Sequence, residues 1–71
     1  MTYSAFLKAF IGVKGELVSR EGSWVFKQED KGEYLVSEVH EDFVILYYPH
    51  NLTFNSIPIS LLRFDYKKGR D

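Results

Sequence analysis

The chain has 71 residues, of which 45% are hydrophobic and 17% are aromatic, and its formal net charge is −1. A chain of this length forms one small domain, which buries only about 60% of the surface that its unfolded chain exposes. The absence of cysteine and of zinc-ligand spacing excludes a disulfide framework and a structural zinc site, and the near-neutral charge disfavours a dedicated nucleic-acid binder with a strong basic field.

The first predicted element is a short amphipathic helix over about residues 3–11. Its apolar residues follow the i, i+3, i+4, i+7, i+8 spacing of one helical face and are Tyr3, Phe6, Leu7, Phe10 and Ile11. Thr2 or Ser4 can cap its N-terminus, and Gly12 can take the left-handed conformation that ends it. Because so short a helix is unstable alone, we expect Phe6 and Phe10 to be buried against the rest of the domain.

From residue 13 the hydrophobic period changes to that of strands, with turn signals between them. The predicted strands are 13–20, 23–28, 33–40, 43–48, 53–57 and 63–66. We therefore expect residues 13–66 to form a small, strongly bent barrel of five to six strands. With the helix and a polar tail at 67–71, the whole chain, residues 1–71, is one mostly β domain.

Three stretches predict local detail within this barrel. Residues 43–48 are apolar at every position, so both faces of that strand should be covered, one by the core and the other by the helix or a neighbouring subunit. The alternation breaks near Ser37, which indicates a β-bulge or a strong bend. Residues 57–62 indicate a strand that ends at Pro58, a single helical turn, and a return to the sheet.

Two short segments resemble the corresponding parts of the Sm-like family in its bacterial Hfq branch. They are Phe6-Leu7-Lys8-Ala9 in the predicted helix and Asp42-Phe43-Val44-Ile45-Leu46 in the fourth predicted strand. The order of elements also resembles the wider set of SH3-like small barrels. The Sm-like resemblance implies a ring-forming barrel that binds single-stranded RNA, and a solitary SH3-like domain is the alternative. Residues 13–22 have no place in the simplest five-stranded register, so we expect them to form an added hairpin arm.

Charge divides the chain into three parts: residues 29–42 carry six acidic residues against Lys31 alone, whereas the segments before and after them are slightly basic. Aromatic rings interleaved with cations are typical of single-strand nucleic-acid binders. The predicted nucleic-acid-binding residues are Tyr48, His50, Asn51, Arg63, Lys67 and Lys68. The alternatives are that Tyr48 is a rim or interface residue, that His50 is an ordinary surface residue, and that the basic residues near the C-terminus only aid solubility.

The sequence predicts no catalytic residues, no metal site and no cofactor. The run His40-Glu41-Asp42 sets an imidazole beside two carboxylates, but side chains at a turn diverge, and an acidic turn is usually solvated. No serine lies in a nucleophile-elbow context, and no Gly-rich phosphate loop is present. We therefore expect a protein that is not an enzyme.

The large apolar load of so small a chain, without a disulfide or metal, favours a homo-oligomer, with strand edges near residues 43–57 at the subunit boundary. The expected function is an Sm-like oligomeric module that binds single-stranded RNA, and the alternative is an SH3-like protein-interaction module. No apolar run reaches the roughly 20 residues of a membrane span, and the first residues lack the basic flank of a signal peptide, so we expect a cytoplasmic protein with no membrane partner.

Overall fold

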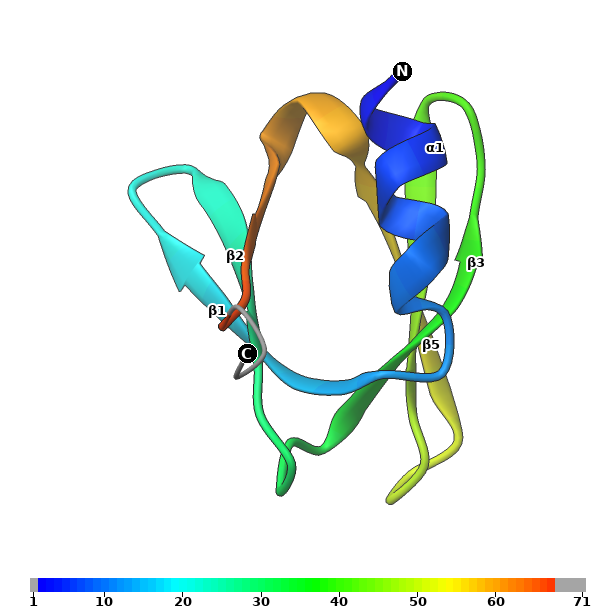
Figure 1. Ribbon diagram of the computed structural model, residues 1–71. Coiled ribbons are helices and arrows are strands. Elements are labelled where there is room, and N and C mark those ends of the chain that lie inside the picture. The colour runs from blue at the N-terminus through cyan, green and yellow to red at the C-terminus, as the bar shows by residue number, and fades with distance from the viewer. Residues whose placement is uncertain (1, 68–71) are drawn as a thin grey trace.

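The computed structural model describes residues 2–67, in which one short helix and two 3₁₀ turns accompany six strands (Figure 1). The elements are α1 (Tyr3–Leu7), η1 (Lys8–Phe10), β1 (Lys14–Arg20), β2 (Ser23–Gln28), β3 (Tyr34–Val39), β4 (Phe43–Tyr48), β5 (Thr53–Pro58), η2 (Ile59–Leu61) and β6 (Leu62–Asp65). Every predicted strand is present, and its ends lie within one residue of the predicted ones. The predicted nucleic-acid-binding residue Lys68 lies outside the described residues.

Leu7, and neither of the two phenylalanines, is the fully buried side chain of the N-terminal helix. Thr2 is the N-cap, and its hydroxyl accepts a hydrogen bond from the backbone N–H of Ala5 at 3.2 Å. Leu7 is 1% exposed and belongs to the core, whereas Phe6 and Phe10 are half-buried. The prediction that both phenylalanines are buried is therefore only partly right, because the helix inserts Leu7 and places the two rings beside it.

Phe6 and Phe10 connect the helical segment to the last strand. The Phe10 ring lies 4.3 Å from that of Phe64 in β6, and both phenylalanine rings lie within 6 Å of the Tyr66 ring. The Tyr3 hydroxyl adds a bond of 3.4 Å to the carbonyl of Leu62. The helical segment therefore lies beside β3 (Figure 1) and reaches β6 through these side chains, across the open side of the bent sheet.

The six strands form one sheet in the order β5-β4-β3-β1-β2-β6. Neighbouring strands are antiparallel except for β2 and β6, which run parallel. The strongly bent, six-stranded, mostly β fold that the sequence predicts is confirmed. The barrel is not closed, however, because β5 and β6 end the sheet on its two sides and are not paired with each other.

Residues 13–22 do not form a projecting arm on an otherwise complete barrel. β1 pairs with β2 over six residue pairs and with β3 at Lys14 and Gly15, so it joins the two halves of the sheet. Gly15 is required there because a Cβ at this position would clash with the Phe26 ring and lie 2.7 Å from the Lys27 carbonyl oxygen. The absence of a side chain therefore lets a buried aromatic ring cross the junction.

The predicted bend and the predicted proline break are both confirmed. The register of β3 against β4 shifts between Val36 and Glu38, so Ser37 is the bulged residue. β5 ends at Pro58, η2 makes one turn, and β6 then returns to the sheet beside β2. Both features curve the chain around a single core, whose buried members are Leu7, Phe26, Val36, Val39, Val44, Leu46, Ile57, Leu62 and Phe64.

The uncharged strand β4 lies second from the edge, between β3 and β5. Val44 and Leu46 point into the core, and the alternate residues Phe43, Ile45 and Tyr47 are half-buried on the opposite face. The helix lies on the core side, since Leu7 packs in the same cluster as Val44. Of the two coverings predicted for the outer face, the helix is therefore wrong and a neighbouring subunit stays a prediction; within the described residues, Tyr47 on this face stacks on Phe54 of β5.

We expect the backbone amides of β4 to be among the slowest in the protein to exchange with deuterium, since strands paired on both sides open only near global unfolding. The amides of β6, which pairs with a neighbour on one side within residues 2–67, serve as the comparison. Hydrogen exchange followed by NMR measures both sets. Exchange in β4 as fast as in β6 would contradict this placement of the core.

Candidate binding surfaces

An aromatic cluster forms around Tyr48 at the end of β4. The Tyr48 ring stacks on that of Tyr34, with centroids 4.9 Å apart and an interplanar angle of 22°, and the His50 ring lies 5.2 Å from Tyr48. Partial burial, followed by the charge and hydrogen bond of the Glu33 carboxylate, raises the pKa of the Tyr48 phenol. Two of the predicted residues therefore lie together, on an aromatic surface bordered by a negative charge.

Asn51 has a structural partner in the turn between β4 and β5. Its side-chain carbonyl accepts a hydrogen bond from the hydroxyl of Thr53, the first residue of β5. The next residue, Leu52, adopts a positive φ of 57°, and it is 73% exposed. Asn51 thus shapes the turn that follows the Tyr48 cluster.

Arg63 lies on β6, at the other edge of the sheet from β5, and Lys67 follows the end of that strand. The Arg63 guanidinium donates two hydrogen bonds to the Asp65 carboxylate, from Nε at 3.1 Å and from an Nη at 3.2 Å. Its charge is therefore neutralised by a bidentate partner. The predicted site divides into two groups, Tyr48–Asn51 and Arg63–Lys67, on different edges of one sheet.

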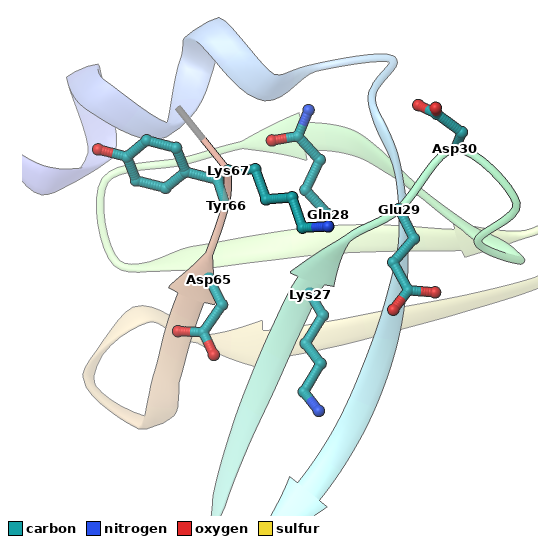
Figure 2. A pocket seen from close by; sticks show the side chains of 7 residues that line it. All are labelled: Lys27, Gln28, Glu29, Asp30, Asp65, Tyr66 and Lys67. Carbon is teal, nitrogen blue, oxygen red and sulfur yellow. The ribbon is translucent and has the colours of Figure 1, made fainter. Parts of the chain in front are cut away.

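Lys67 lines an open hollow of about 560 Å³ beyond the ends of the parallel strands β2 and β6. Figure 2 shows its lining side chains: Lys27, Gln28, Glu29, Asp30, Asp65, Tyr66 and Lys67. The ammonium group of Lys67 reaches toward the middle of the hollow, and the carboxylates of Glu29 and Asp65 lie on its two sides (Figure 2). Two cations and three carboxylates give no surface of one sign that would select a phosphate.

The outer face of β4 and β5 is a surface that the predicted site residues miss. Tyr47 and Phe54 are cross-strand partners, their ring centroids are 4.6 Å apart, and Phe54 is 61% exposed. Residues 43–62 contain no Asp, Glu, Lys or Arg. This uncharged run is visible in the sequence and could have indicated the surface, whereas the pairing of Tyr47 with Phe54 follows from the strand register.

His40 does not form a cluster with the two acidic residues that follow it. Its ring stacks on Phe43 at 4.4 Å, and its Nε2 lies 3.2 Å from the Glu38 carboxylate. Because the ring is used in these contacts at an exposed strand end, it orders the β3–β4 turn. Residues 2–67 hold no group of three His, Asp or Glu side chains that could bind a metal ion.

The part of the chain that the structure describes has no helix with the length and apolar content needed to span a membrane. No protein-family model, curated protein or solved structure matches this chain. Inference about function therefore depends on the surfaces described above.

Proposed function

We propose that this chain is a non-catalytic assembly module that pairs with further copies of itself through an exposed strand edge. The observation that carries the proposal is the uncharged edge hairpin β4–β5, which the structure leaves open along β5 (Figure 1). An edge strand is a template for another strand, and proteins that must stay monomeric block such edges with charges or bulges.

The two edges of the sheet differ in this respect. β6 carries the ion pair of Arg63 and Asp65 and is only four residues long. β5 is six residues long, it has no charged side chain, and it exposes Phe54. Of the two edges, β5 therefore has the properties of a pairing strand, and its burial in an assembly would shield apolar surface that the small monomer leaves in water.

We expect light scattering on the untagged protein at micromolar concentration to give a multiple of the 8.3 kDa monomer mass. Phe54→Lys should lower the mass to that of the monomer, because it places a charge beside the pairing edge. Ile11→Lys is the matched control, since it introduces the same charge at an exposed apolar residue of the N-terminal segment. A mass near 8.3 kDa for the unmodified chain would overturn the proposal.

Single-stranded RNA binding is the second candidate, favoured by the Tyr34–Tyr48 stack, since bases stack on exposed aromatic rings. RNA binding ranks below self-assembly because the neighbouring Glu33 carboxylate would repel phosphates. Binding of a labelled single-stranded RNA should weaken as salt rises, and Tyr48→Ala should reduce the affinity by about 1–3 kcal/mol, the usual value of one stacked base. Failure to bind at low salt, or equal binding by the Tyr48 variant, would remove this candidate.

A further inference from the structure

The free edge of β5 offers a defined set of backbone groups. The N–H of Ile59 donates to the carbonyl of Asp42 at 2.9 Å, and the same ladder continues through Val44 opposite Ile57 and Leu46 opposite Asn55. In an antiparallel pair, residues that bond to the neighbour alternate with residues that point away from it. Ile57 and Asn55 therefore bond toward β4, and Phe54, Ser56 and Pro58 direct their backbone groups away from it.

Within residues 2–67, no strand of this chain pairs with these outward groups. The absence of charged residues from 43–62 determines which kind of strand can pair with these groups. A two-fold interface sets each residue beside its own copy or its near neighbours, so a charged edge would repel itself. β5 is free of that repulsion. A second copy of the same strand is therefore the occupant that the edge fits.

We infer, on the basis of the proposed self-assembly, that two copies of this chain pair β5 with β5 in antiparallel orientation about a two-fold axis at Asn55. Phe54 of each copy then lies opposite Ser56 of the partner subunit. Both residues direct N–H and C=O outward, so the two pairs make four backbone hydrogen bonds. The two copies join their sheets into one continuous sheet.

Pro58 excludes an axis at the next outward residue, Ser56. An axis at Ser56 would set Pro58 opposite Phe54 of the partner subunit, where the missing N–H would leave a carbonyl without a donor. An axis at Asn55 keeps Pro58 outside the four bonds. It also brings the two Asn55 side chains together, and an amide can donate and accept at once, so two identical amides can bond to each other.

The side chains of the outer face agree with this pairing. Phe54 and Tyr47 stack beside the edge on the face opposite the core, so the dimer continues this aromatic surface across the axis. The acidic β3–β4 turn at Glu41 and Asp42 lies at one end of the hairpin, away from an axis in the middle of β5. No like charges are therefore brought together at the centre of the interface.

Cysteine cross-linking in this cysteine-free chain tests the arrangement. Under mild oxidation Asn55→Cys should give a covalent dimer in high yield, because residues facing each other across the axis lie within the Cα separation of about 4.4–6.8 Å that a disulfide needs. Ser56→Cys should give several-fold less, since its two copies are offset along the strands. Ser19→Cys, an exposed residue of β1, is the control and should give none.

A second measurement uses the unmodified chain and does not depend on the variants folding. The amides of Phe54 and Ser56 should exchange quickly with deuterium in dilute solution and at least tenfold more slowly when the protein is concentrated. The amides of Arg63 and Asp65 on the other edge should not change in this way.

The outcomes separate this inference from the proposed function. A light-scattering mass of several subunits, with no excess cross-linking of Asn55→Cys over Ser19→Cys, would overturn the β5 pairing and leave self-assembly in place. Preferential cross-linking of Ser56→Cys would overturn the axis at Asn55. A monomer at every concentration would overturn both.

Discussion

Phe26→Ala is expected to lower the free energy of unfolding by about 3–5 kcal/mol, the range for truncating a fully buried aromatic ring. Phe26 is 0% exposed, its ring stacks on that of Phe64 at 4.6 Å, and it crosses the face of Gly15 where no side chain intervenes. Its removal would leave a cavity between β1, β2 and β6 that backbone pairing keeps from collapsing. Urea denaturation followed by tryptophan fluorescence measures the change.

The matched control is Phe54→Ala, which removes the same ring from a residue that is 61% exposed. At a concentration at which light scattering gives the monomer mass, we expect its effect to stay within about 0.5 kcal/mol, as for most surface substitutions. Equal effects of the two variants would show that Phe26 is not the centre of the core.

Leu7→Ala is expected to lower the free energy of unfolding by about 2–5 kcal/mol, the range for removing a buried leucine side chain. Leu7 is the single buried residue of α1, and it packs with core residues from both halves of the sheet. The helix has only five residues and would not be stable without this contact. The loss should therefore include undocking of the helix, seen as a change in the environment of Phe10 and Tyr66 by NMR.

Ile11→Ala provides the comparison for Leu7, since Ile11 is 49% exposed and belongs to the same predicted helical face. A small change for Ile11 and a large one for Leu7 would confirm that one side chain anchors the segment. An unfolding midpoint that Leu7→Ala leaves unchanged would contradict the docked helix.

The strands and their ends were predictable from the sequence because residues next to each other in the chain determine them. The strands are bounded by turn signals such as Gly22 or Pro49-His50-Asn51, and the strand ends follow these signals closely. The bulge at Ser37 and the break at Pro58 were also predictable, since each disturbs the period at a particular residue.

Strand order was not predictable in the same way, because it depends on contacts between residues far apart in the chain. The place of β1 between β2 and β3 depends on the close approach at Gly15, which no local pattern reveals. The parallel pairing of β2 with β6 follows from the path of the chain around the core. The sheet consequently ends at β5 and β6, where the sequence predicted a barrel.

In the candidate site, too, contacts between residues close in the chain were predictable and contacts made by the fold were not. Tyr48 and His50 lie together because they are close in the chain, but Tyr34 joins them only through the fold. Arg63 was predicted to contact phosphate, yet its neighbour two residues along the strand points to the same side and neutralises it. A count of cations along the sequence cannot separate a free guanidinium from a paired one.

The narrow junction between β1 and β3 affects how the domain responds to stress. Two residue pairs, with the flanking bonds of Gly12 and Val36, connect a half-sheet of β5, β4 and β3 to another of β1, β2 and β6. If these backbone bonds were the sole link, the two halves would separate easily under a pulling force. What holds them together is the shared interior, to which both halves and Leu7 contribute. The mechanical strength of this fold therefore resides in side-chain packing rather than in the hydrogen bonds of its sheet.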